Sequence, residues 1–190
     1  MILMKPELNS VILLSGPTGA GKTTLAKEIN SNQASLHVST SSLILEIFPN
    51  LKPSRRSLQK AGNRLDLESK YAWISMELMK LIKRYPEKTM IVDSVRVPEQ
   101  ILSIRKKIVD ISIFHFHVHA SYERAVHRHK LRDRDIDVGL QYHDLQSDVS
   151  EGWHSQLAQM SDLFLDADDA CPNELAESVI DFINKSNFSD

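Results

Sequence analysis

A short glycine-rich segment that follows Ser15 carries the clearest chemistry in this chain of 190 residues. It matches the pattern G-x-x-x-x-G-K-[ST], which is typical of a loop that binds phosphate groups. Glycines allow backbone N–H groups to turn inward, and the helix N-terminus that we expect next completes an anion cradle. The residues that we expect to bind a nucleotide are Gly16, Pro17, Thr18, Gly19, Ala20, Gly21, Lys22, Thr23 and Thr24.

Three side chains in and near this pattern suit the chemistry of a nucleotide with its metal ion. The ammonium group of Lys22 can reach the β- and γ-phosphates, and the hydroxyl of Thr23 can bind Mg²⁺. Asp93 ends a short apolar run, where a carboxylate often helps to hold Mg²⁺, although a turn residue is the plain alternative. The sequence therefore predicts ATP and Mg²⁺ as cofactors, with Lys22 as a catalytic residue and Thr23 and Asp93 at the metal.

Arginines form two further groups. Arg55 lies in the most basic segment of the first half of the chain and could clamp an acceptor phosphate bidentately. Arg124, Arg128 and Arg132 are spaced four apart, so they share one helical face. Phosphoryl transfer needs positive charge over the migrating group, so we expect Arg128 and Arg132 to be catalytic and Arg124 to contact the donor nucleotide. A solvated helix face is the alternative for each arginine.

Strand-like and helix-like segments alternate along the chain. Expected strands cover residues 11–15, 36–39, 89–93, 111–119 and 163–165. Apolar residues spaced three or four apart predict a helix from Leu67 to Ile82, with Gly62 as a helix stop before it and Asp66 as its cap. Such alternation predicts a parallel sheet with helices on both faces, whose ligands bind beyond the carboxyl ends of the strands.

The segments at these strand ends resemble those of P-loop nucleotide kinases. Val38–Leu43 is similar to the IST-G-D-L segment of adenylate-kinase-type nucleoside monophosphate kinases, with Ser41-Ser42 in place of Gly-Asp. Asp93–Glu99 resembles the D-V-R-x-P-x-E segment of phage-type deoxynucleoside monophosphate kinases, with one residue inserted. Residues 123–128 resemble the E-R-x-x-x-R helix of nucleotide kinases, and residues 161–175 resemble the tail shared by dephospho-coenzyme A, gluconate and shikimate kinases.

This resemblance implies a three-layer α/β/α P-loop NTPase fold with five parallel strands in the order 2-3-1-4-5. It implies a single domain over residues 1–190, with an acceptor-binding insert at about 40–85 and a short lid at about 128–150. Ser39, Thr40 and Arg96 would bind the acceptor beside Arg55.

The function implied is transfer of the γ-phosphoryl group of ATP to a nucleoside or deoxynucleoside monophosphate. Three alternatives remain: a P-loop kinase acting on another small metabolite or on a polynucleotide, a non-kinase ATP-binding switch or ATPase, and a tRNA prenyltransferase. The last is disfavoured because its Asp-Ser-x-Gln segment should follow the second strand, whereas Asp93-Ser94 follows the third.

Composition limits the partners. The formal net charge of −2 disfavours extended nucleic-acid binding. Cys171 is the single cysteine, and no apolar run is long enough to span a bilayer, so we expect a cytoplasmic protein that does not act at a membrane. The row His115, His117 and His119 could hold zinc, but partly buried histidines beneath a helix are the simpler reading. Trp73 is expected to pack in the core or lid, and the oligomeric state is open.

Overall fold

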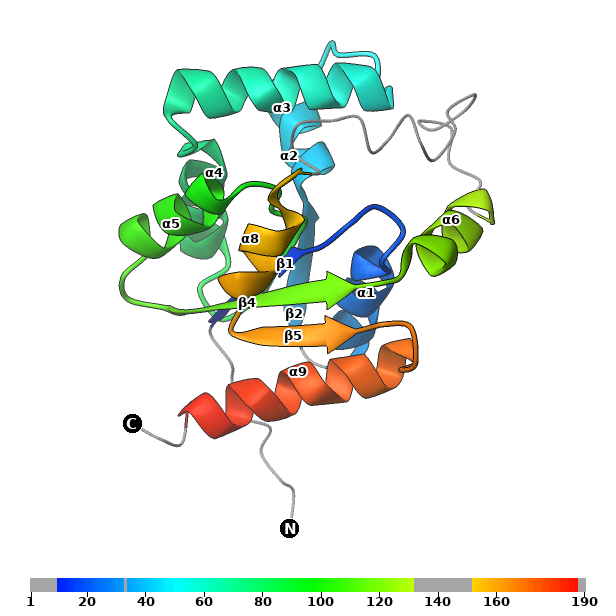
Figure 1. Cartoon of the computed structure of the whole chain (residues 1–190). Helices are drawn as coiled ribbons and strands as arrows, with labels where there is room; N and C mark the ends of the chain where they lie inside the picture. Colours follow the sequence, from blue (N-terminus) through cyan, green and yellow to red (C-terminus); the bar gives the residue numbers. More distant parts are fainter. Residues whose placement is uncertain (1–9, 33, 132–151, 188–190) are drawn as a thin grey trace.

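The computed structural model describes residues 10–32, 34–131 and 152–187 (Figure 1). The strands are β1 (Ser10–Ser15), β2 (Ser35–Ser39), β3 (Thr89–Asp93), β4 (Ser112–His119) and β5 (Leu163–Asp166). The helices are α1 (Lys22–Asn32), α2 (Thr40–Ile47), α3 (Arg55–Ser69), α4 (Trp73–Arg84), α5 (Pro98–Lys107), α6 (Tyr122–Lys130), α8 (His154–Gln159) and α9 (Pro172–Asn187). Within these described ranges, no helix is both long and apolar enough to cross a membrane.

The five strands form one parallel sheet in the order β2-β3-β1-β4-β5, which confirms the predicted topology. All six residues of β1 are buried because this central strand is covered on both faces. The carboxyl ends of parallel strands meet at one edge of the sheet. The glycine-rich loop follows β1 at this edge, and Asp93 closes β3 beside it.

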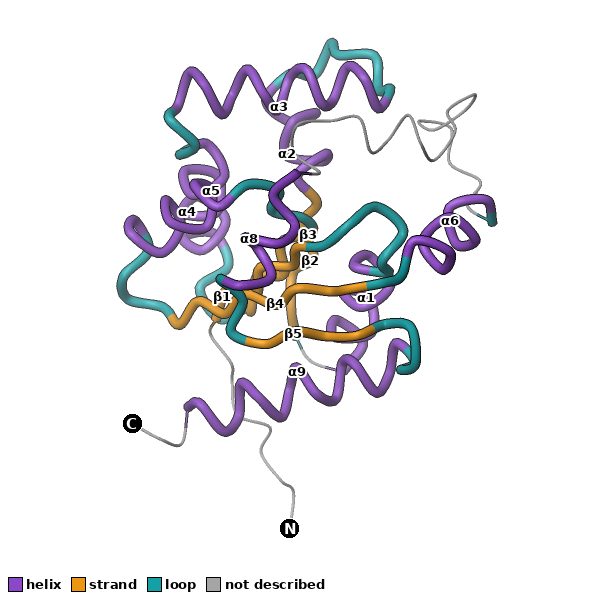
Figure 2. The backbone as a smooth tube through the Cα atoms, viewed as in Figure 1, coloured by secondary structure: helices purple, strands orange, loops and turns teal. Residues whose placement is uncertain are grey.

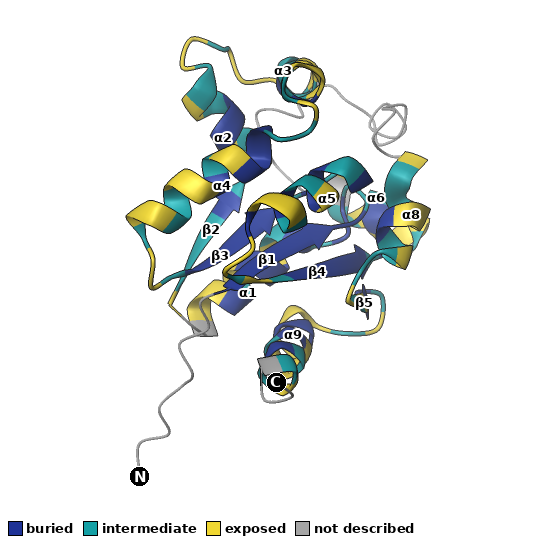
Figure 3. Ribbon diagram, turned by 90° about the vertical axis from the view of Figure 1, so that its left-hand side faces the viewer, coloured by how far each residue is buried: buried dark blue, intermediate teal, exposed yellow. Residues whose placement is uncertain are grey.

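Two layers of helices cover the sheet. Side chains alternate between the two faces of β1. Ile12 and Leu14 pack in a core with α1 and α9, whereas Val11 and Leu13 pack in a second core with α4, α5 and α8. In Figure 3, β1, β3 and most of β4 are buried, β2 is mostly of intermediate exposure, and exposed residues gather on the outer faces of the helices. This arrangement is the predicted three-layer α/β/α fold.

The connection between β2 and β3 carries α2, α3 and α4. Figure 2 shows α3 across the top of the molecule, above α2 and away from the strands. Ser54 caps α3 through a reciprocal pair of hydrogen bonds with Ser57, which fixes where that helix begins. The position of α3 allows its first residue to approach the loop after β1.

The predicted helix from Leu67 to Ile82 is wrong, because the chain breaks between α3 and α4. Lys70 and Tyr71 have φ angles of 52° and 63°, which an α-helix cannot contain. Leu67 is therefore exposed rather than part of an apolar stripe.

Two smaller expectations in this segment are also wrong. Gly62 does not stop a helix but lies inside α3, where an added Cβ would come 3.4 Å from Cδ1 of Ile44 in α2. Asp66 does not cap the next helix, since it lies buried within α3 and accepts a hydrogen bond from Nε1 of Trp73. The structural roles of Gly62 and Asp66 thus depend on packing between helices, which local sequence patterns do not show.

Candidate active site

The glycine-rich loop is held against β4 and α6 by close backbone packing. Gly16 has a φ of 134°, and a Cβ there would lie 2.0 Å from the carbonyl oxygen of Val118. Gly19 has a φ of 88°, and its Cβ would lie 2.6 Å from the carbonyl oxygen of Ala125. Both positions therefore require glycine for their conformation and for lack of space. The loop ends directly at the N-terminus of α1, which is the geometry that an anion cradle requires.

Lys22 lies within this cradle. Its Nζ donates hydrogen bonds to the carbonyl oxygens of Gly16 (2.6 Å) and Pro17 (2.8 Å), and the residue is buried. The ammonium group is thereby held across the loop whose N–H groups would surround phosphate oxygens. This placement suits a lysine that follows charge onto the outer phosphates of a nucleotide.

Thr23 and Asp93 meet at the ends of α1 and β3. The Thr23 hydroxyl donates to Oδ2 of Asp93 at 2.6 Å, and Nε2 of His37 on β2 lies 3.6 Å from the same oxygen. Burial alone would raise the pKa of Asp93, but His37, the charge of Lys22 and the Thr23 hydroxyl together lower it below the usual value. The carboxylate is therefore ionised at neutral pH.

This pair fits Mg²⁺, which prefers oxygen ligands and keeps several waters. Among the described residues, no group of three or more His, Cys, Asp or Glu side chains could hold a metal. Of the described residues, Thr23 and Asp93 are those that would supply oxygen ligands, beside oxygens of phosphate and water. His37 was missed by sequence reasoning because its approach to Asp93 depends on the pairing of β2 with β3.

Arg55 reaches the phosphate loop from the start of α3. Its Nη2 donates to Oγ1 of Thr18 at 2.8 Å, across 37 residues of sequence. The structure thus brings together a residue expected on the acceptor side and a residue expected on the donor side. Ser39, by contrast, caps α2, because its hydroxyl accepts a hydrogen bond from the Ser42 N–H.

A small cavity of about 30 Å³ lies beneath α3, at the ends of β2 and β3. It contains two residues expected to bind the acceptor, Thr40 and Arg96. Among the described residues, none forms a hydrogen bond or ion pair with the guanidinium of Arg96. The other lining residues are Ser41, Ile44, Leu58, Gln59, Gly62, Asn63, Asp66, Trp73, Ser94 and Gln100.

We call this space the acceptor cavity, after the role predicted for Thr40 and Arg96. A buried polar network forms one of its walls. Oδ1 of Asp66 accepts hydrogen bonds from Nε1 of Trp73 (2.7 Å) and Nε2 of Gln100 (2.9 Å). Oε1 of Gln100 in turn accepts from the backbone N–H of Arg96 at 2.9 Å. Burial raises the pKa of Asp66 despite these hydrogen bonds. Sequence reasoning missed Asp66 and Gln100, although Asp66 shares a helical face with Leu58, which was a signal that it is buried.

A second pocket of about 440 Å³ lies on the other side of the phosphate loop, within the usual range for a small-molecule site. Its lining residues are Gly19, Ala20, Gly21, Thr24, Leu25, Arg128, Leu131, Ala167, Ala170, Pro172 and Leu175. Arg128 joins its walls, since Nη1 donates to Ala20 O (3.1 Å) and Nη2 to Ala167 O (2.6 Å). We call this the donor pocket.

Arg124, another arginine of the predicted group, does not line this pocket. Arg124 is exposed on α6, where its charge acts on Asp168. Arg132 and most of the predicted lid, residues 132–150, lie outside the described residues.

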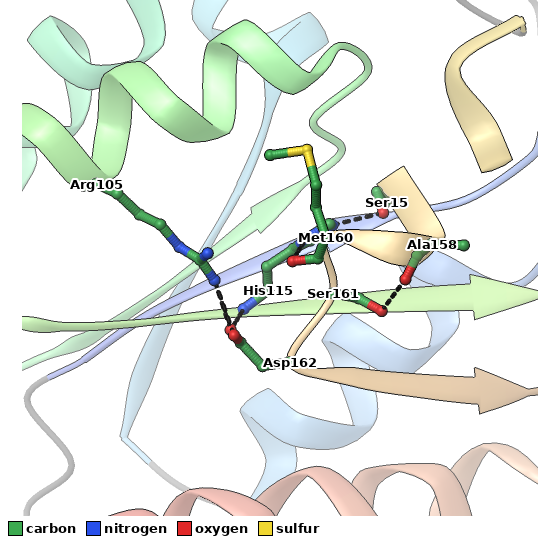
Figure 4. Close-up of polar contacts among 7 residues, drawn as sticks. All are labelled: Ser15, Arg105, His115, Ala158, Met160, Ser161 and Asp162. Carbon is green, nitrogen blue, oxygen red and sulfur yellow. Dashed lines mark hydrogen bonds and ion pairs between the residues drawn. The ribbon is translucent and has the colours of Figure 1, made fainter. Parts of the chain in front are cut away.

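His115 and His117 of β4 are buried, whereas His119 at the end of this strand is half-buried. Figure 4 shows His115 beside Ser15 of β1. Nδ1 of His115 lies 3.3 Å from Met160 O and can donate to it, so its Nε2 accepts from the Ser15 hydroxyl at 2.7 Å. His117 can then donate from Nδ1 to Ser15 at 2.9 Å. Burial, the main cause, lowers the pKa of His115 to about 4 and that of His117 to about 3. These rings are neutral structural parts of the strand, as the simpler expectation held.

An ion pair beside them fixes the start of β5. Nη2 of Arg105 donates to Oδ2 of Asp162 at 2.7 Å, and the same carboxylate oxygen accepts from the backbone N–H of His115 at 2.7 Å (Figure 4). This contact ties α5 to β4 at a distance from the loop, so we assign it to the fold rather than to the site.

The fold is that of small P-loop kinases. APS kinase of Mycobacterium tuberculosis, solved with AMPPNP and APS, superposes with a TM-score of 0.57 at 17% identity, covering 94% of this chain and 99% of that one. Shikimate kinase of Acinetobacter baumannii, solved with shikimate, gives 0.57 at 14%, covering 95% and 96%. A gluconokinase of Sinorhizobium meliloti 1021 gives 0.55 at 13%, covering 94% and 93%.

Sequence comparison agrees with the placement of the loop. A search of curated protein sequences finds no match. A family model described as AAA domain matches residues 15–139, which contain the phosphate loop, Asp93 and α6. That match covers more than half of the chain and begins at the residue before the glycine-rich loop. The chain therefore belongs to the AAA domain family, within which it has the fold of a P-loop kinase.

Proposed function

We propose that this protein is an ATP-dependent kinase that transfers the γ-phosphoryl group to a nucleoside or deoxynucleoside monophosphate. The observation that carries the proposal is the contact of Arg55 with Thr18, which joins the acceptor cavity side to the phosphate loop. A switch that only binds and hydrolyses ATP has no need for an arginine-containing cavity on that side. Arg55 and Arg96 would hold the acceptor phosphate, Thr40 would line its site, and Ser39 would shape that site by capping α2.

The residues of the loop would position the donor. Bound Mg²⁺ would neutralise charge on the β- and γ-phosphates, held by Thr23 and, directly or through water, by Asp93. Lys22 would stay with the γ-phosphoryl group as charge develops, and the N-terminus of α1 would add its dipole. The protein needs no covalent step, since positioning and electrostatic stabilisation supply the catalysis.

Arg128 and Arg132 are our proposed transition-state arginines. Arg128 already lies at the donor pocket, where it would have to exchange the carbonyls of Ala20 and Ala167 for phosphate oxygens. Arg124 is proposed to contact the donor nucleotide from α6. In this proposal, the insert at residues 40–85 and the lid at 128–150 bring acceptor and donor together. A cytoplasmic location remains a prediction.

The test is a panel of acceptors with γ-labelled ATP and Mg²⁺. It should contain ribo- and deoxyribonucleoside monophosphates, shikimate, gluconate and an oligonucleotide with a free end. We expect the unaltered protein to transfer label to one class of monophosphate. The Lys22→Ala variant, assayed in its place, should transfer none. ATP hydrolysis at one rate with every compound and without any would contradict the kinase proposal and favour an ATPase or switch.

The second candidate is a kinase that phosphorylates a hydroxyl group of a small metabolite. The cavity of about 30 Å³ favours it, because a whole base and sugar exceed that space in the conformation described. Kinases of shikimate and gluconate share the fold at 14% and 13% identity. Label on shikimate, gluconate or a related polyol, and on no nucleotide, would select this candidate.

A further inference from the structure

The carboxylate of Asp66 is an unusual wall for a cavity in which we propose that an anionic acceptor binds. Asp66 is 9% exposed in the last turn of α3, and it is the only acidic side chain that lines the cavity among the described residues. A buried carboxylate is costly unless donors satisfy its oxygens. The hydrogen bonds that the two oxygens of Asp66 accept therefore show whether the carboxylate can still accept a hydrogen bond from a ligand in the cavity.

The two carboxylate oxygens of Asp66 are satisfied unequally. Oδ1 accepts two short hydrogen bonds, from Trp73 and Gln100. Within the part of the chain that the structure describes, Oδ2 accepts only the longer branch of the bifurcated Gln100 amide, at 3.1 Å. An ionised carboxylate offers about four acceptor positions, so Oδ2 retains the capacity for a donor that enters from the cavity.

Gln100 cannot supply the recognition itself. It is 3% exposed, its Nε2 is spent on Asp66 and its Oε1 accepts from the N–H of Arg96. Its role is to fix the position of the Asp66 carboxylate relative to the backbone of Arg96. An acceptor that meets both would carry a hydrogen-bond donor at one end and an anionic group at the other.

The size of the cavity limits the donor group. A water molecule needs about 10–15 Å³ of such space, so a cavity of about 30 Å³ admits an amino or hydroxyl group but not a ring. A carbonyl oxygen at this place would face the carboxylate and leave it without a partner, which is strongly unfavourable.

We propose that Asp66 is the specificity-determining residue of the acceptor site and that it selects nucleotides whose base carries an exocyclic amino group over their keto analogues. This inference rests on the proposed function, since it takes the acceptor to be a nucleoside monophosphate. The amino group donates to Oδ2 of Asp66 while Arg96 and Arg55 hold the phosphate.

The experiment compares two matched pairs of acceptors, AMP with IMP and CMP with UMP, at saturating Mg²⁺-ATP. We expect kcat/KM for an amino member to exceed that of its keto partner by at least tenfold. Asp66→Asn keeps an oxygen for Trp73 and turns an N–H₂ group to the cavity. It should lower kcat/KM for the amino member by roughly 10- to 100-fold, raise it for the keto member, and leave the Kd of ATP unchanged.

Two further variants separate recognition from folding. Trp73→Phe removes a hydrogen bond to Oδ1 and keeps the carboxylate in the cavity, so it should lower the melting temperature but retain the amino preference. Asp162→Asn makes the same carboxylate-to-amide change in the ion pair with Arg105, far from the cavity, and should leave both activity and preference unchanged.

The outcomes are distinct. Equal use of amino and keto members by the unaltered protein overturns the inference, even if Asp66→Asn fails to fold. A folded Asp66→Asn protein with an unchanged preference also overturns it and reduces Asp66 to a structural residue, while the proposed kinase stands. Phosphorylation of no nucleotide at all, with ATP still bound, overturns the proposed function and the inference with it.

Discussion

At the scale of the residue, Lys22 is predicted to contribute to catalysis through its charge. Its Nζ lies across the loop, bound to the carbonyls of Gly16 and Pro17. Lys22→Ala removes the charge that would follow the γ-phosphoryl group, so kcat should fall by about 10²–10³-fold or more. The measurement is steady-state transfer from labelled ATP. Lys27→Ala, an exposed change on the same helix, is the control, and near-normal turnover of Lys22→Ala would refute the loop assignment.

Asp93 is predicted to act through its negative charge rather than through its shape. Asp93→Asn keeps the size of the side chain and can keep the contact with Thr23. It removes the negative charge, so the Mg²⁺ concentration for half-maximal rate should rise and the maximal rate should fall. Because the pKa of Asp93 is lowered, the Mg²⁺ requirement of the unaltered protein should not change between pH 6 and 8. Asp110→Asn, at an exposed site, controls for charge, and an unaltered Mg²⁺ titration would make Asp93 a turn residue.

At the scale of the element, β4 carries buried histidines that link stability to pH. The folded-state pKa values of about 4 for His115 and about 3 for His117 lie below the unfolded value of 6.5. The unfolded chain therefore binds more protons below pH 6.5, and stability falls as pH falls from about 6.5 toward 4. Each ring can contribute a loss on the order of a few kcal/mol.

The check is urea unfolding at several values between pH 7.5 and 4. The double variant His115→Gln, His117→Asn can keep hydrogen bonds near Ser15 but cannot titrate in this range. It should be less stable than the unaltered protein at pH 7.5 and should lose less stability on acidification. His127→Gln, at an exposed position of α6, should retain the original slope. An equal slope in the double variant would show that the rings are not the source.

Elements with strong local signals were predictable. The apolar runs that became β1, β3 and β4 lie between turn signals, and Pro98 and Pro172 begin α5 and α9 as proline at a first turn should. The sequence also placed Asp93 correctly at a strand end. The alternation of strands and helices predicted a parallel sheet, while the strand order came from the resemblance to nucleotide kinases. Because the carboxyl ends of parallel strands share one edge, Asp93 could be expected close to the glycine-rich loop.

Elements fixed by long-range packing were not predictable. The break at Lys70 and Tyr71 has no glycine or proline to announce it, and Gly62 continues a helix because α2 packs against it. Asp66 and Gln100 are 34 residues apart and meet only when α3 folds over the β3 edge. The acceptor half of the site therefore depends on contacts that no local pattern encodes.

At the scale of the whole molecule, the phosphate loop divides the site into two halves. The acceptor cavity lies on the β2–β3 side under α3, and the donor pocket lies on the side of β4, β5 and α9. Gly19, Ala20 and Gly21 line the donor pocket, while Thr18 of the same loop receives Arg55 from the acceptor side. If the protein is a kinase, variants on the acceptor side and variants on the donor side should therefore change different kinetic constants.

The last prediction uses this division. Arg96→Ala should raise the acceptor KM by roughly 10- to 100-fold and leave the Kd of ATP unchanged, because it removes a charge-assisted contact on the acceptor side alone. Arg55→Ala should share this effect. Arg132→Ala should lower kcat with little change in the Kd of ATP, since a lid arginine acts mainly in the closed state. Arg128→Ala should lower kcat more than it weakens ATP binding, despite its contacts in the donor pocket.

Initial-rate kinetics and calorimetric titration with a non-hydrolysable ATP analogue provide the measurements, and Arg84→Ala, at an exposed end of α4, is the matched control. Residual ATP hydrolysis should survive in Arg55→Ala and Arg96→Ala, because the donor half is intact. Suppose instead that hydrolysis is independent of every acceptor and indifferent to both changes. The two halves would then not communicate, and the molecule would be an ATP-binding switch rather than a kinase.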